Sequence, residues 1–229
     1  LLVLPLLVLM AAVAWTHRGA PAAAVVRGGP GLRALLGQPG VRRFLLVASL
    51  MQLGFGAYYV FFTLYMQRSG HDGLVVGSLW AVGVLAEVIV FWFMPALMGR
   101  LGAVRLFGLC LVLTVVRWLA IALFPGQLAV VFPVQLLHAF SFGAFHSASM
   151  RMLAEFFPGR SLGAGQSLLY ALGSGAGGLA GALLAAAAWD TGGGRLTFLG
   201  AAAVTLLAWV IHLRGRLARA DAAGAARLE

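Results

Sequence analysis

The chain has 229 residues, of which 62% are hydrophobic and only 10% are charged. Soluble domains carry about 25% charged residues, so this composition excludes a soluble globular protein and indicates an integral, helical membrane protein. The formal net charge of +10 does not indicate nucleic-acid binding, because the arginines lie mainly between apolar runs and form no single basic face. Lysine is absent, which excludes Schiff-base chemistry, and the lone cysteine, Cys110, cannot form an intrachain disulfide.

Apolar runs long enough to cross the roughly 30 Å hydrocarbon core of a bilayer follow one another along most of the chain. We therefore predict an all-α fold, a polytopic bundle of transmembrane helices. The run 1–15 is interpreted as the end of an earlier span, and the Gly-, Pro- and Arg-rich segment 16–42 as a flexible cytoplasmic linker. Residues 43–213 are predicted to form a six-helix bundle and residues 214–229 a cytoplasmic tail. The predicted spans are 43–66, 74–98, 104–124, 128–150, 161–188 and 196–213.

The distribution of arginines predicts the orientation of these spans. Alternate gaps between spans hold only Arg68 and Arg195, and by the positive-inside rule these gaps face outward. The linker, the loops at 99–103 and 151–160 and the C-terminal tail are then cytoplasmic. Their arginines are Arg18, Arg27, Arg33, Arg42, Arg43, Arg100, Arg105, Arg151, Arg160, Arg214, Arg216, Arg219 and Arg227.

Three ionisable residues interrupt the most apolar spans: Glu87, Arg117 and His138. A charge at the centre of a bilayer costs roughly 2.5–3.5 kcal/mol on insertion scales, so charges kept there usually serve a function. Each residue lies 12 or 13 positions from a cytoplasmic arginine, which places all three at a depth of roughly 18–20 Å. Substrate and coupling-ion sites of secondary transporters lie at this level. The alternative is a structural Glu87–Arg117 pair that only fixes helix packing.

Other polar and small residues suggest the walls of a cavity. The first full span is aromatic and includes Tyr58 and Tyr59, while Gln166, Tyr170 and Ser174 form a polar stripe in a later one. Packing against neighbouring helices or at the membrane interface explains single aromatic residues equally well. His146 is open to two interpretations, a packing histidine or a member of the site.

A stripe of glycines, Gly173, Gly177 and Gly181, allows close approach of helix backbones. It fits either static packing or a surface that slides against another half of the protein. The sequence contains no serine-nucleophile, zinc-protease or phosphate-loop motif, so we expect no enzyme and no metal.

Several stretches resemble members of the major facilitator superfamily. The loop with Gly99, Arg100, Gly102 and Arg105 is similar to the conformational loop motif of that superfamily, although Gly99 stands where the motif has Asp. The stretches 76–91, 115–118, 57–59 and 135–140 resemble the 3-phenylpropionate (hydrocinnamate) permease group, which is akin to lactose permease and nucleoside–proton symporters.

This resemblance implies a C-terminal half, helices 7–12, of a twelve-helix transporter. Arg117 and His138 match an Arg and a His of lactose permease, but Ser141 occupies the position of that protein's coupling Glu. Glu87 is therefore the expected proton carrier, with Arg117 and His138 as the other proton-coupling residues. Substrate binding is expected at Tyr58, Tyr59, Trp80, Arg117, Gln135, Gln166 and Tyr170.

The expected function is proton-coupled symport of a small organic solute, favouring an aromatic carboxylate such as phenylpropionate, with the proton as coupling ion and no other cofactor. Sugar or nucleoside transport, drug efflux, and a receptor or scaffold without transport stay open as alternatives. The expected partners are the lipid bilayer, an N-terminal half of the same transporter and the small-molecule substrate, and the expected location is the bacterial cytoplasmic (inner) membrane.

Overall fold

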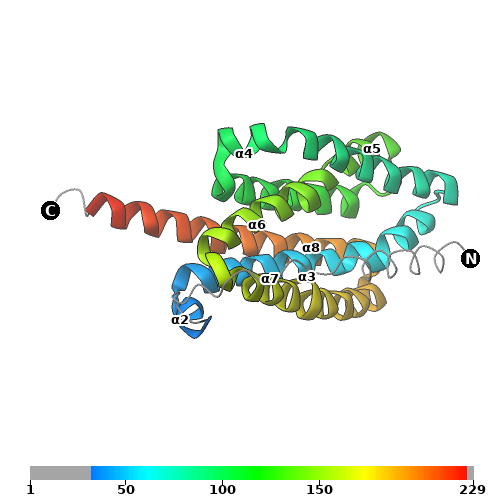
Figure 1. The fold of residues 1–229 in the computed structure, drawn as a ribbon. Coiled ribbons are helices and arrows are strands. Elements are labelled where there is room, and N and C mark those ends of the chain that lie inside the picture. The colour runs from blue at the N-terminus through cyan, green and yellow to red at the C-terminus, as the bar shows by residue number, and fades with distance from the viewer. Residues whose placement is uncertain (1–31, 226–229) are drawn as a thin grey trace, which may run out of the picture.

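The computed structural model describes the backbone of residues 32–225 and the side chains of residues 32–215, and every regular element in this part is a helix (Figure 1). The prediction of an all-α fold is confirmed. The elements are α2 (Leu32–Gly37), α3 (Pro39–Arg68), α4 (Gly73–Leu123), α5 (Leu128–Leu136), the π-helix η1 (Phe140–Ala144), α6 (Phe145–Phe156), the 3-10 turn η2 (Gly159–Ser161), α7 (Leu162–Tyr170), the π-helix η3 (Ala171–Gly177) and α8 (Gly178–Ala225).

Four helical stretches of the described chain are long and apolar enough to cross a membrane. Two of them contain a glycine with non-helical backbone, Gly102 in α4 (φ 71°) and Gly193 in α8 (φ 64°). Positive φ is inexpensive only for glycine, so the chain can reverse at these two positions. Figure 1 shows both reversals, and the described residues therefore form the six antiparallel segments that the apolar runs predict.

The predicted end of an earlier span, 1–15, and most of the predicted linker, 16–42, lie outside the described residues, which begin at residue 32. From there the linker segment is helical, as α2 and the first turn of α3. Pro39 occupies the start of α3, where its fixed φ and missing N–H fit a first helical turn. The predicted tail is helical as far as Ala225.

Helix α3 packs mainly against α8 and η3. The predicted glycine stripe forms this contact: a Cβ on Gly177 would lie 2.8 Å from the backbone oxygen of Ser49, and one on Gly181 would collide with Leu53 O. Gly56 on α3 approaches Gly181 and Ala182 in the same way. The stripe therefore packs closely against α3 in this conformation, and a sliding role for it stays a prediction.

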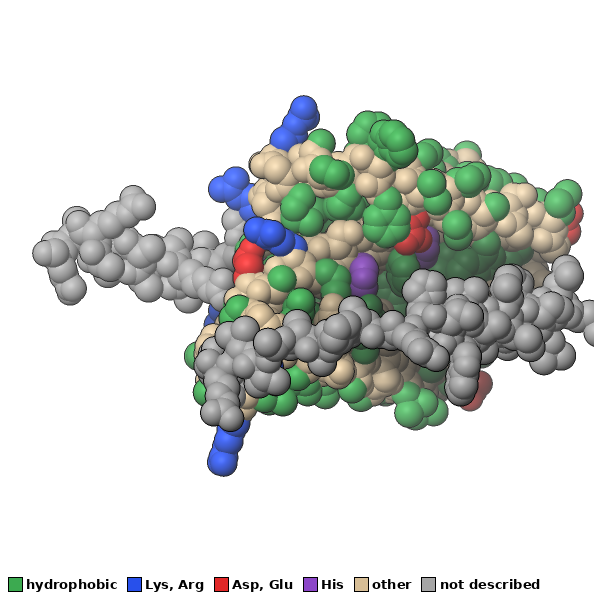
Figure 2. Space-filling view, viewed as in Figure 1, with side chains coloured by type: hydrophobic (Ala, Val, Ile, Leu, Met, Phe, Trp, Pro, Cys, Tyr) green, Lys and Arg blue, Asp and Glu red, His purple; other side chains and the backbone are tan. Residues whose placement is uncertain are grey.

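Charged side chains are unevenly distributed along the length of the bundle. On the face drawn in Figure 2 the arginine side chains gather at the end where α4 doubles back, acidic side chains appear at both ends and midway, and histidine side chains reach the surface midway along the bundle. Arg68 lies near the opposite end, with its guanidinium carbon 4.9 Å from the ring centroid of Trp189.

Candidate functional site

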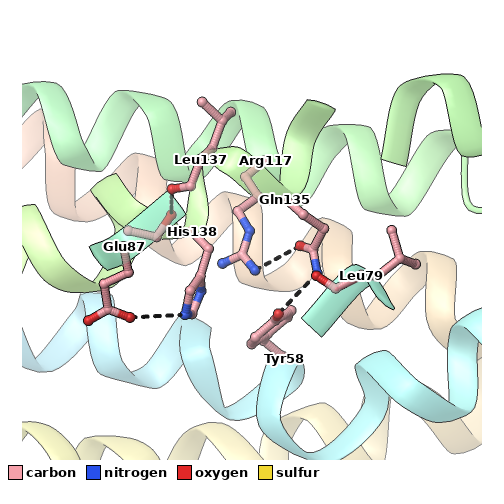
Figure 3. A network of polar contacts seen from close by, with 8 residues as sticks. Tyr58, Leu79, Glu87, Arg117, Gln135, Leu137 and His138 are labelled. Atoms are coloured by element: carbon pink, nitrogen blue, oxygen red, sulfur yellow. Dashed lines mark hydrogen bonds and ion pairs between the residues drawn. The ribbon is translucent and has the colours of Figure 1, made fainter. Parts of the chain in front are cut away.

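The centre of the candidate site is a contact between two helices that are far apart in sequence. The Nε2 atom of His138 lies 3.7 Å from a carboxylate oxygen of Glu87, an ion pair whenever the imidazole is protonated (Figure 3). Glu87 comes from the first half of α4, and His138 lies just after α5, before the π-helix η1. Their side chains are 16% and 7% exposed, so the pair is shielded but still reachable from one side.

Two glycines bring these helices close enough for the contact. A Cβ on Gly143 would lie 2.9 Å from Cγ of Glu87, and a Cβ on Gly83 would lie 3.3 Å from Cβ of His138. Each glycine thus leaves room for one member of the pair. Sequence reasoning missed both, although a glycine four or five residues from a buried ionisable group was the available signal.

Arg117 lies beside this pair but has different partners. Its side chain is fully buried, and its Nη2 donates a hydrogen bond to Oε1 of Gln135 at 3.0 Å. The guanidinium carbon lies 4.2 Å from the ring centroid of Tyr58 and 4.7 Å from that of Trp118, both cation–π distances. The structural Glu87–Arg117 pair is not formed: the ion pairs among the described residues join Glu87 to His138 and Arg151 to Glu155.

The contacts from Glu87 to Gln135 form one continuous set, which we call the polar chain: Glu87, His138, Tyr58, Arg117 and Gln135. The rings of His138 and Tyr58 lie 5.7 Å apart, and Gln135 Nε2 donates to the Tyr58 hydroxyl at 3.2 Å and to the Leu79 carbonyl at 3.2 Å. Figure 3 shows these residues converging from α3, α4 and α5. The three ionisable residues predicted at one depth therefore belong to a single contact set.

Two aromatic residues of the predicted substrate site are engaged within the protein. Tyr58 is fully buried, with its ring 4.6 Å from that of Trp80. The indole nitrogen of Trp80 donates to the Thr63 hydroxyl at 3.1 Å. In this conformation neighbouring rings enclose Tyr58, and its part in substrate binding stays a prediction. Tyr59, which is 55% exposed, is available.

The remaining predicted residues lie on other parts of the bundle. Gln166 contacts the sulfur of Met150 at 4.0 Å and takes no part in the polar chain, whereas Tyr170, one turn later, is 50% exposed and faces a hollow. Ser141, at the position of the lactose-permease Glu, is buried and accepts a hydrogen bond from Thr114 at 2.9 Å.

The conformational loop motif falls at the reversal of α4. Gly102 has the positive φ that the turn requires, and a side chain would be strained there. Arg100 and Arg105 flank the turn and are exposed. The positive φ of the turn therefore explains the glycine at position 102. A role of Arg100 and Arg105 in conformational change stays a prediction.

Chemically, the polar chain combines a carboxylate and an imidazole, which can exchange a proton, with a permanently charged guanidinium. Nε and Nη1 of Arg117 have no hydrogen-bond partner within the described residues. Leaving a buried donor unpaired costs about 1–3 kcal/mol. The arrangement therefore favours a negatively charged group arriving from outside the described structure.

Comparison with known proteins agrees with this architecture. The sequence profile described as the "MFS_1 like family" matches residues 2–200. A protein named "Probable 3-phenylpropionic acid transporter" from Escherichia coli (strain K12) is 38% identical over 112 residues, which are 49% of this chain and 29% of that relative. The match thus spans less than a third of the relative's length. Because the family profile covers most of the sequence, this integral membrane chain belongs to the MFS_1-like family of major facilitator transporters.

Proposed function

We propose that the chain forms one half of a secondary transporter that carries a small aromatic carboxylate together with a proton. Membership of a transporter family supports transport over an enzymatic role, and the name of the bacterial relative supports an aromatic acid such as 3-phenylpropionate as the solute. An N-terminal half of the same protein would form the opposite wall of the pathway, and the cytoplasmic membrane would be its location.

The single observation that carries this proposal is the environment of Arg117. A fully buried guanidinium faces two aromatic rings and one amide oxygen, and no described carboxylate pairs with it. Buried charges in proteins are normally paired, because an uncompensated charge in a low-dielectric interior is costly. A substrate carboxylate could supply the missing partner through paired N–H···O hydrogen bonds.

The neighbouring Glu87–His138 contact would supply the proton coupling. With Glu87 ionised and His138 protonated, the two charges satisfy each other at 3.7 Å. Neutralising Glu87 removes that attraction and leaves His138 and Arg117 as the cationic side chains for an incoming anion. Proton and substrate would then favour the same arrangement of the helices, and two ligands that prefer one state bind cooperatively.

Uptake by the full-length transporter in proteoliposomes tests the proposal. We expect radiolabelled phenylpropionate to accumulate when the vesicle interior is alkaline, and to equilibrate without accumulation when an ionophore collapses the proton gradient. A sugar and a nucleoside at the same concentration serve as alternative substrates. Accumulation of either one in place of phenylpropionate, or uptake indifferent to the proton gradient, would contradict the proposal.

A further inference from the structure

A second polar site lies next to the polar chain, in a groove bordered by α3, α6 and η3. Its polar lining consists mainly of Gln52 on α3, His146 on α6, Tyr170 at the end of α7 and Ser174 on η3. None of these residues belongs to the polar chain, and the proposed proton coupling does not use them. We call this surface the Gln52–His146 groove.

The groove has unused hydrogen-bonding capacity. Gln52 Nε2 donates to the Ser174 hydroxyl at 3.1 Å, which leaves one amide hydrogen and the Oε1 oxygen of Gln52 available. Among the described residues, His146 has a ring contact with Tyr170 at 6.3 Å but no hydrogen bond from either ring nitrogen. With a neutral imidazole, two donors and two acceptors of Gln52 and His146 are therefore free, within the described structure, beside the same hollow.

Both π-helices of the described chain line this groove. Ser141 and Phe142 come from η1, and Gly173 and Ser174 come from η3. A π-helical turn inserts an extra residue at a cost in helix geometry, and such turns are frequent at functional sites. Because two π-helices line one groove, its wall fits a ligand site better than simple helix packing.

The groove adjoins an aromatic hollow, one of whose lining rings contacts His138. This hollow is lined by Phe55, Tyr59 and Phe142, and it shares Gln52, Phe142 and Ser174 with the groove. The Phe142 ring stacks on that of His138 at 5.8 Å, with an angle of 9° between the planes. Gln52 and Tyr59 lie two turns apart on α3, a rise of about 10 Å, so the groove and the hollow together follow this helix over that length.

We infer that the Gln52–His146 groove binds a hydrogen-bonding substituent on the aromatic ring of the solute, so that the substrate class is a ring-hydroxylated aromatic carboxylate. The carboxylate would lie at Arg117 and His138, the ring between Tyr59 and Phe142, and the ring hydroxyl at Gln52 and His146. This assignment rests on the proposed function, because it takes the aromatic acid as the solute. A purely apolar ring would leave the polar groups of the groove to water, whereas a hydroxyl can both donate to and accept from them.

Binding to the purified full-length transporter tests the assignment, with 3-phenylpropionate and 3-(4-hydroxyphenyl)propionate titrated separately. The wild type is expected to bind the hydroxylated acid more tightly, by roughly 3- to 10-fold, as one or two partly exposed hydrogen bonds would provide. His146→Phe and Gln52→Leu should each remove most of this preference while leaving the affinity for phenylpropionate within about twofold. Two variants on different helices are used so that misfolding of one does not decide the result.

Gln67→Leu is the matched control, because Gln67 is an exposed glutamine on the same helix as Gln52 but lies outside the groove. It should preserve the preference for the hydroxylated acid. Equal affinity of the wild type for both acids, or variants that weaken both acids equally, overturns the assignment and leaves the proposed function intact. Failure of both acids to bind overturns the assignment together with the proposed function.

Discussion

His138 Nε2 lies 3.7 Å from the Glu87 carboxylate, and Arg117, the other buried charge, has no carboxylate partner among the described residues. The three ionisable residues of the site are therefore divided into the Glu87–His138 contact and Arg117, a neighbouring cation without a carboxylate partner among the described residues. Such a division gives the protein two ways to balance its charges. In the proposed mechanism, Glu87 would neutralise a protonated His138 in the unloaded site, and a bound anion would take over that task once Glu87 is protonated.

Replacing the acid should separate binding from coupling. In the full-length transporter we expect Glu87→Gln to abolish accumulation of substrate against its gradient, because an amide cannot release a proton. Exchange of internal for external substrate should persist, since it needs no net proton movement. Counterflow and gradient-driven uptake measure the two activities. Glu155→Gln removes an exposed carboxylate paired with Arg151 and should change neither. Accumulation by Glu87→Gln at the wild-type level would show that Glu87 carries no proton.

Gly143, which faces Glu87, should be needed for proton-coupled accumulation. Gly143→Ala places a Cβ 2.9 Å from Cγ of Glu87, so the carboxylate must shift relative to His138. Overpacking of this kind costs about 1–3 kcal/mol, so we expect folded protein with impaired accumulation. Gly77→Ala is the control, because a Cβ at Gly77 meets nothing within 4 Å. The idea fails if both variants accumulate substrate equally well.

The spans could be predicted because hydropathy and arginine position are local properties of a sequence. The depth of Glu87, Arg117 and His138 followed from the same count, since helical rise fixes how far a residue lies from a helix end. Which of them touch could not be predicted. Contact depends on how two helices rotate and approach, and here the approach is set by Gly83 and Gly143, whose importance appears only when both helices are in place.

The groove was harder to foresee, because its wall departs from regular helix geometry. The spacing that grouped Gln166 with Tyr170 and Ser174 assumed an unbroken α-helix, whereas η3 begins directly after Tyr170. Ser174 therefore pairs with Gln52 in the groove, while Gln166 contacts Met150. Tyr58 lies on the helix that the sequence predicts, but its complete burial by neighbouring aromatic rings depends on tertiary packing and could not be predicted.

The predicted orientation can be measured with two serines at opposite ends of the bundle. In a Cys110→Ala background we expect Ser69→Cys to react with a membrane-impermeant maleimide in intact cells. Ser161→Cys should react only after permeabilisation, because it follows the arginine-bearing 151–160 loop. Cys110 is the one natural cysteine, so its removal leaves the introduced thiol as the only target of the maleimide. The opposite labelling pattern would reverse the assigned topology.

Tight packing of the glycine stripe predicts a loss of stability. Gly177→Ala directs a Cβ to 2.8 Å from the backbone oxygen of Ser49, and backbone cannot move aside as a flexible side chain can. We expect a destabilisation of about 1–3 kcal/mol, seen as a lower thermal unfolding midpoint in detergent. At Gly200 a Cβ meets nothing within 4 Å, so Gly200→Ala should leave the midpoint unchanged. Equal midpoints for the two variants would show that the helices separate at little cost.

Arg117→Met should distinguish an anion-binding arginine from a structural one. Methionine preserves much of the apolar volume but removes a buried cation, whose side-chain hydrogen-bond acceptor among the described residues is Gln135. Removing an unpaired buried charge relieves its desolvation cost, which offsets the loss of the donor to Gln135, so the unfolding midpoint should not fall far. Loss of a charge-assisted hydrogen bond, about 1.5–3 kcal/mol, should weaken phenylpropionate binding roughly 10- to 150-fold.

Arg151→Met provides the matched comparison, because Arg151 is exposed and paired with Glu155 at the surface. Its loss should alter neither phenylpropionate affinity nor stability by more than a few tenths of a kcal/mol. For Arg117→Met, unfolding midpoint and affinity must be read together. A large fall in the midpoint with unchanged affinity would assign Arg117 to helix packing, whereas unchanged stability with lost affinity would identify the guanidinium as the partner of the substrate carboxylate.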